Sequence, residues 1–134
     1  MNTGIGYRSD GKGIIYIENS NVEFDNYNFD NNLVNPITTS TYKGLAAYIT
    51  DNSTVTVDNS SFSDNYINSR GTSTYGGLIY LDSGSLEINN TEFSNNGLIS
   101  DGSTVQGGAI YMNNNTSLSI NGSSFDANYV QSGS

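Results

Sequence analysis

The sequence predicts an all-β fold, a parallel β-helix of about four coils, and three observations carry this prediction. The first is a repeat with a spacing of 31 to 33 residues. It is marked by the tyrosines Tyr16, Tyr48, Tyr80 and Tyr111. The second is the alternation of apolar and polar residues within each repeat, which is the period of a strand. The third is that Asn, Gly, Asp and Ser fill the gaps, as turns require.

Each repeat is expected to form one coil, because a single short coil cannot enclose a core and must stack on its neighbours. The coils are predicted at residues 12–43, 44–75, 76–106 and 107–134, within one domain over residues 1–134. Each coil should contain three short strands. The first two strands place alternate apolar residues inward. These inward residues are Ile15, Ile17, Val22, Phe24, Ala47, Ile49, Val55, Val57, Ile79, Leu81, Leu86, Ile88, Ile110, Met112, Leu118 and Ile120.

The third strand of each repeat carries a phenylalanine that is followed three residues later by an asparagine. The phenylalanines are Phe29, Phe62, Phe93 and Phe125, and the asparagines are Asn32, Asn65, Asn96 and Asn128. Amide side chains at equivalent places in stacked coils can hydrogen-bond to each other and to the turn backbone. We therefore predict that both sets form structural ladders, with the phenylalanines inside and the asparagines at a buried corner.

The tyrosines of the first strand have the opposite parity and are predicted to face outward. This tyrosine column consists of Tyr16, Tyr48, Tyr80 and Tyr111, beside aliphatic residues such as Ile14. A column of this kind predicts an exposed apolar stripe that contacts a sugar, a partner protein or a neighbouring rod. The alternative is that the rings only stabilise the sheet by stacking from coil to coil. The sequence leaves both interpretations open.

Composition argues against several classes of function. The chain of 134 residues has a net charge of −9 and only four cations, whereas nucleic-acid binding needs clustered Lys or Arg. Histidine and cysteine are absent, no calcium-loop spacing is present, and no acid cluster recurs from coil to coil. We therefore expect no metal, no cofactor and no enzymatic activity. No apolar run approaches the ~20 residues of a membrane helix, so membrane insertion is not expected.

The Gly-Gly-Ala-Ile segment at residues 107–110, followed by Phe-Asp-Ala-Asn at residues 125–128, resembles the repeat pair of the polymorphic outer-membrane proteins. These are autotransporter adhesins, and adhesin-like surface proteins of bacteria and archaea share the pattern. Residues 76–79 with 93–96 match nearly as well, whereas the first two coils depart from the pattern. The resemblance covers the chain from residue 12. It implies a right-handed β-helix of the pectin lyase-like kind, an extracellular or cell-surface location, and a passenger segment of a longer protein.

The sequence therefore predicts a non-enzymatic structural or adhesive segment of a cell-surface protein. Its partner would be itself, through end-to-end or lateral association, or a glycan or protein on a cell surface. No capping element is visible, and open strand edges pair with other strands. The coils are thus expected either to continue in a longer chain or to stack from copy to copy into a fibre. The second hypothesis is a carbohydrate-binding module that uses the tyrosine column, and a polysaccharide-cleaving enzyme ranks last.

Overall fold

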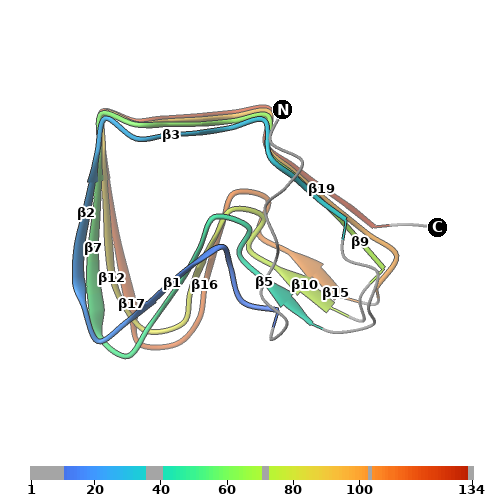
Figure 1. Ribbon diagram of the computed structural model, residues 1–134, viewed down its shortest axis with the longest axis horizontal. Coiled ribbons are helices and arrows are strands. Elements are labelled where there is room, and N and C mark those ends of the chain that lie inside the picture. Colours follow the sequence, from blue (N-terminus) through green and yellow to red (C-terminus); the bar gives the residue numbers. More distant parts are fainter. Residues whose placement is uncertain (1–10, 36–40, 71–72, 103, 133–134) are drawn as a thin grey trace.

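The computed structural model describes residues 11–35, 41–70, 73–102 and 104–132, and these residues form a solenoid of parallel strands without a helix. Each strand position stacks into its own parallel sheet (Figure 1). From blue to red, the coils run clockwise in Figure 1 and recede from the viewer, which is the right-handed sense. The predicted right-handed parallel β-helix is therefore confirmed.

Three of the sheets contain the predicted strands, with four strands in each. The first sheet contains β1 (Ile15–Glu18), β6 (Ala47–Thr50), β11 (Ile79–Leu81) and β16 (Ile110–Met112). The second sheet contains β2 (Asn21–Asp25), β7 (Ser53–Asp58), β12 (Gly84–Asn89) and β17 (Thr116–Asn121). The third sheet contains β3 (Asn28–Asp30), β8 (Ser61–Ser63), β13 (Glu92–Ser94) and β18 (Ser124–Asp126).

Two further sheets were not predicted, so the expectation of three strands per coil is incomplete. The fourth sheet contains β4 (Leu33–Val34), β9 (Tyr66–Ser69), β14 (Gly97–Ser100) and β19 (Tyr129–Ser132). The fifth sheet contains β5 (Tyr42–Lys43), β10 (Ser73–Tyr75) and β15 (Thr104–Gln106). Between these two sheets, residues 36–40, 71–72 and 103 lie outside the described residues.

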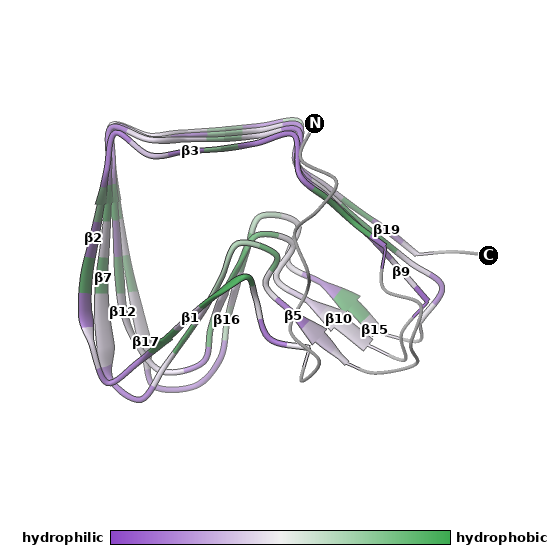
Figure 2. Cartoon of the chain, in the orientation of Figure 1, coloured by the Kyte–Doolittle hydropathy of each residue, from purple (hydrophilic) through white to green (hydrophobic). Residues whose placement is uncertain are grey.

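The core lies inside the coils and is built from equivalent residues stacked in register. Phe62 pairs with Phe29 on one side and with Phe93 on the other. The rings of Phe62 and Phe93 stack with a centroid separation of 4.8 Å, and those of Phe93 and Phe125 with 4.6 Å. Figure 2 shows apolar and polar stretches alternating along each coil at matching places in neighbouring coils. The inward parity predicted for the first three strands therefore produces one continuous apolar core.

The asparagines after the third strand form a continuous amide ladder at the corner before the fourth sheet. The Nδ2 group of Asn65 donates to Oδ1 of Asn96 at 2.9 Å and to the carbonyl oxygen of Phe29 at 2.6 Å. The side chain of Asn96 repeats both bonds, to Asn128 and to the carbonyl of Phe62. Each Oδ1 also accepts the backbone N–H of the preceding asparagine. The ladder therefore satisfies the buried polar groups of this corner.

A second polar ladder was not anticipated. The hydroxyl oxygens of Ser60, Thr91 and Ser123 accept backbone N–H groups from the coil before, at 3.0 to 3.2 Å. Ser60 and Thr91 are buried. Their function is to satisfy the backbone where the chain turns from the second sheet into the third.

Residues with positive φ produce the corners. Asn31, Asp64 and Asn95 occupy the same corner in successive coils, with φ of 58°, 54° and 53°. Asparagine and aspartate tolerate this left-handed conformation better than other residues with a β-carbon. Ala127 takes the equivalent place in the last coil at φ 51° without that advantage. The abundance of Asn and Asp in the sequence is thus explained by the geometry of the coil corners.

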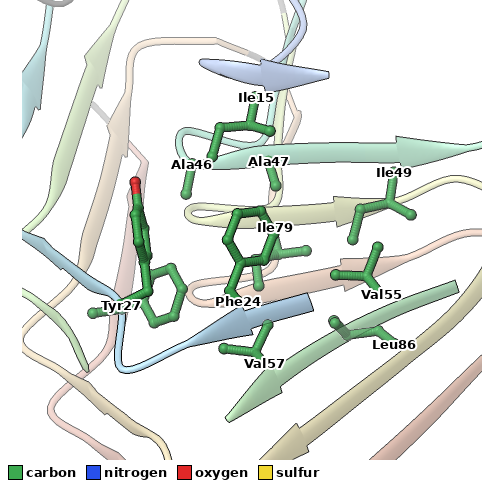
Figure 3. Close-up of a pocket in the computed structure, with 11 residues that line it drawn as sticks. Ile15, Phe24, Tyr27, Ala46, Ala47, Ile49, Val55, Val57, Ile79 and Leu86 are labelled. Atoms are coloured by element: carbon green, nitrogen blue, oxygen red, sulfur yellow. The ribbon is translucent and has the colours of Figure 1, made fainter. Parts of the chain in front are cut away.

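The core contains a small apolar hollow, shown in Figure 3. It has a volume of about 10 Å³, and its lining includes Phe24, Ala46, Ala47 and Val57. Ala47 pairs in register with Ile15 and Ile79, so a smaller side chain stands between two larger ones. The hollow is a packing gap beside the small side chain of Ala47, and it is too small to hold a ligand.

Candidate functional site

The tyrosine column exists and lies on the outer side of the first sheet. Tyr16 stacks on Tyr48 with ring centroids 5.5 Å apart, Tyr48 on Tyr80 at 5.1 Å, and Tyr80 on Tyr111 at 5.0 Å. The planes of successive rings differ by 16° or less. The predicted parity is therefore correct, because these side chains point away from the core residues of the same strands.

The predicted exposure of the column is wrong for its two central members, since Tyr48 and Tyr80 are each only 4% exposed. They are covered by the fifth sheet, which the sequence did not predict. The chain reverses sharply at Gly44 and Gly76, where φ is +66° and +63°. These turns fold the fifth sheet back so that it faces the outer side of the first sheet, and the two sheets form the arms of an inverted V in Figure 1.

Lys43 and Tyr75 of the fifth sheet cover the column together with Lys12, which forms a β-bridge with Lys43. The Nζ atom of Lys12 lies 4.9 Å from the ring centroid of Tyr16, and that of Lys43 lies 4.8 Å from the ring centroid of Tyr80. The ring of Tyr75 packs at 5.2 Å from that of Tyr111. Ammonium groups at such distances are attracted to the ring face. The column is therefore part of a second, smaller core outside the main coil.

An acidic side chain completes this cluster. The hydroxyl of Tyr48 donates to Oδ2 of Asp82 at 2.7 Å, and Nδ2 of Asn113 donates to Oδ1 at 2.8 Å. Burial and then this hydrogen bond raise the pKa of Tyr48. Burial acts to raise the pKa of Asp82, but hydrogen bonds from Asn113 and Tyr48 and the charges of Lys43 and Lys12 outweigh it and lower that pKa. The Asp82 carboxylate is thus held in its charged form.

The free energy of unfolding is expected to fall as the pH rises above about 10, the ordinary pKa of tyrosine. Burial, followed by the effect of Asp82, raises the pKa of both Tyr48 and Tyr80 in the folded chain. Above pH ~10 the unfolded chain therefore releases protons that the folded chain retains, so stabilisation that is complete below that pH is lost as the pH rises. Urea unfolding between about pH 8 and pH 11 measures this slope.

The matched variant for this prediction is the double substitution Tyr48→Phe with Tyr80→Phe, which retains both rings and removes the titrating hydroxyls. Its stability at neutral pH is expected to be lower, because the bond to Asp82 is lost. Its free energy of unfolding is expected to fall less steeply with alkaline pH than that of the wild type, because the two titrating hydroxyls are absent. The lysines contribute equally in both proteins, so the difference between the two slopes is due to the tyrosines. Equal slopes in the two proteins would contradict the assignment of the alkaline loss to these tyrosines.

The geometry favours the stabilising interpretation of the central tyrosines over sugar stacking. A sugar ring packs on an open aromatic face, but the faces of Tyr48 and Tyr80 are covered by neighbouring rings at about 5 Å. Tyr16 and Tyr111, at the two ends, are partly exposed. In the described parts of the chain, no group of three or more acidic side chains is placed to bind a metal ion.

Exposed apolar side chains lie instead on the end coil, formed by β16 to β19. Ile120, Phe125 and Val130 occupy the inward positions of their strands, yet they are 43%, 42% and 40% exposed. Their equivalents in the coil before, Ile88, Phe93 and Leu98, are each 0% exposed. We call these three residues of the end coil the end face. The end face is a cross-section of the core that no described residue covers.

No protein-family model, curated protein or solved structure matches the chain. Within the described ranges, no helix is present that has the length and apolar character needed to cross a membrane. The assignment of a function therefore rests on the geometry of the coil and its surfaces.

Proposed function

We propose that this protein is a non-enzymatic structural β-solenoid. We propose also that its end face binds a coil of a second copy of the same chain. The observation that carries the proposal is the contrast between two successive coils. Phe125 is 42% exposed, whereas Phe93, one coil earlier in the same stack, is 0% exposed. Covering the end face with one more coil would remove apolar surface from water, which is the main favourable term in association.

The polar ladder supports a coil of the same kind as the occupant. In the interior coils, the Nδ2 group of each asparagine donates both to a phenylalanine carbonyl of the coil before and to an asparagine of the coil after. Asn128 makes the first of these bonds, to the carbonyl of Phe93 at 2.8 Å. A following coil with an asparagine at this place would accept the second. A partner of unrelated chemistry would not continue this ladder.

The backbone of the end coil supports the same proposal. β17 pairs with β12 in a parallel ladder over six residues, and its other edge faces the end of the solenoid. Open edges of parallel sheets present N–H and C=O groups to another strand. The end coil thus combines the apolar side chains of the end face, the amide donor of Asn128 and the strand edge of β17. These are the three kinds of contact that join the interior coils.

An extracellular, cell-surface role is part of the proposal. It is supported by the resemblance of the Gly-Gly-Ala-Ile and Phe-x-x-Asn repeats to those of adhesins. In such a setting the solenoid would act as a rod, and adhesive contacts with a glycan or protein would use its sides.

The proposal is tested by the mass of the purified chain, measured by light scattering over a wide concentration range and by negative-stain microscopy. Wild type is expected to form rods that lengthen with concentration. Ile120→Lys places a charge in the end face and is expected to stay monomeric. The matched control is Ser119→Lys, because Ser119 neighbours Ile120 on β17 and has the opposite parity. It adds the same charge on the outer side and is expected to assemble like the wild type.

Two outcomes would overturn the proposal. One is a wild-type chain that stays monomeric at every concentration. The other is assembly by Ile120→Lys to the same extent as by Ser119→Lys, because association would then use another surface. Far-ultraviolet spectra of both variants establish that the solenoid is intact before the masses are compared.

A further inference from the structure

The outer face of the fourth sheet carries a surface column that the preceding sections do not use. Leu33, Tyr66, Gly97 and Tyr129 pair in register across β4, β9, β14 and β19. They point outward, because the residues that follow them, such as Ile67 and Leu98, are buried at 0% exposure. The column therefore runs along the side of the solenoid, and its last member, Tyr129, lies in the end coil.

Two tyrosines of this column lean together over a glycine. The ring centroids of Tyr66 and Tyr129 are 6.4 Å apart with an interplanar angle of 47°. Gly97 lies between them, and a Cβ atom there would stand 2.5 to 2.8 Å from ring and hydroxyl atoms of Tyr129. Only a residue without a side chain allows this arrangement. We call Tyr66 and Tyr129 the tyrosine pair.

Tyr129 is exposed and Tyr66 is partly exposed, whereas the two central members of the tyrosine column are buried. Tyr129 is 38% exposed and Leu33, in the same outward row, is 37% exposed, compared with 4% for Tyr48. The next outward positions along the strands are occupied by Asn68 and Gln131, which are also exposed. Aromatic and apolar surface is thus bordered by side-chain amides, which can both donate and accept hydrogen bonds.

A hollow of about 80 Å³ adjoins the tyrosine pair. It is lined by Asn31, Asn32, Leu33, Asp64 and Tyr66. Its volume exceeds the share of ~30 Å³ that one water molecule takes in the liquid, so it can receive part of a ring with its hydroxyl groups. Asp64 lies at this corner as an acceptor. Burial, followed by Asp64 and Tyr129, raises the pKa of Tyr66. Like any tyrosine hydroxyl, that of Tyr66 can donate a hydrogen bond at neutral pH.

We propose that the tyrosine pair and the adjoining hollow bind a neutral glycan chain of pyranose sugars. The C–H faces of a pyranose pack on aromatic rings, while its hydroxyls need amide or carboxylate partners within reach. Both are present on this face. An anionic glycan is disfavoured, because Asp64 lies at the hollow and the chain has a net charge of −9. Glycan binding is measured separately from coil stacking, since the site faces the side of the solenoid and its test uses binding in place of mass.

The first experiment is binding of the wild-type chain to an array of neutral oligosaccharides, with uronate-containing oligosaccharides as the anionic arm. The best neutral ligand is then titrated by calorimetry into Tyr66→Ala, Tyr129→Ala and Gly97→Val. The first two substitutions remove a ring. The third retains both rings and displaces that of Tyr129. Each is expected to weaken binding by about tenfold, the effect of losing one aromatic contact.

The matched control is Tyr111→Ala, which removes a tyrosine from the same end coil but on the outer face of the first sheet. It is expected to bind as the wild type does, with an unchanged far-ultraviolet spectrum required of all variants. The proposal is overturned if the wild type binds no neutral glycan, or only the uronate glycans. It is also overturned if Tyr111→Ala loses affinity while Tyr129→Ala retains it, which would place the site on the tyrosine column.

Discussion

Replacing Asn96 by alanine is expected to lower the free energy of unfolding by about 2 to 6 kcal/mol. The side chain is 1% exposed and makes four hydrogen bonds. Its loss would leave the backbone N–H and one Nδ2 proton of Asn65 buried without a partner. Each buried polar group left unsatisfied costs about 1–3 kcal/mol. Urea unfolding monitored in the far ultraviolet measures the change.

Asn128→Ala is the matched control, because Asn128 is the member of the same ladder that lies in the end coil. It is half-buried, and water can reach the groups that its removal would expose. We expect this substitution to cost about 1 kcal/mol, the net value of an ordinary hydrogen bond. Equal losses from Asn96→Ala and Asn128→Ala would show that burial does not set the strength of the ladder.

The asparagine ladder could be predicted from the sequence because its position in the repeat never varies. Asn32, Asn65, Asn96 and Asn128 each follow a phenylalanine by three residues, so stacking coils in register necessarily superimposes them. The same argument predicted the phenylalanine stack and the inward positions of the first three strands. These features depend only on spacing and parity, both of which are visible in a single sequence.

The burial of the tyrosine column could not be predicted in the same way. Parity correctly indicated that Tyr48 and Tyr80 leave the main core, but parity says nothing of what lies outside a sheet. They are covered by strands β5, β10 and β15. The residues at the matching inward position of these strands, Tyr42, Thr74 and Val105, differ in chemical type, so no repeat of one residue type marks these strands in the sequence. Connections of unequal length precede these strands, so their positions in the repeat shift. The positive φ of the glycines that follow is a property of the folded backbone.

The fourth sheet left a signal that the sequence interpretation missed. Val34, Ile67, Leu98 and Val130 recur at the spacing of the repeat, two residues after each asparagine of the ladder. Each run is short and is followed by a connection of variable length, so its periodicity is harder to recognise than that of the first three strands. Tyr66 and Tyr129 lie on this sheet, so the same omission left these two outward tyrosines unnoticed.

Replacing Phe93 by alanine is expected to lower the free energy of unfolding by about 3–5 kcal/mol, the usual cost of removing a large buried aromatic side chain. Phe93 is 0% exposed, and its ring stacks on Phe62 at 4.8 Å and on Phe125 at 4.6 Å with nearly parallel planes. The cavity left behind would be walled by backbone that the neighbouring coils hold in register. Urea unfolding of the dilute chain measures the loss.

Phe125→Ala provides the matched comparison, since it removes the same side chain from the same stack one coil later. In the dilute monomer it should cost about half as much or less, because Phe125 is 42% exposed and stacks on one phenylalanine only among the described residues. In assembled rods Phe125 would be an interior residue, and its removal should then cost nearly as much as that of Phe93. A cost for Phe125→Ala that stays the same from dilute to concentrated solution would contradict coil stacking on the end face.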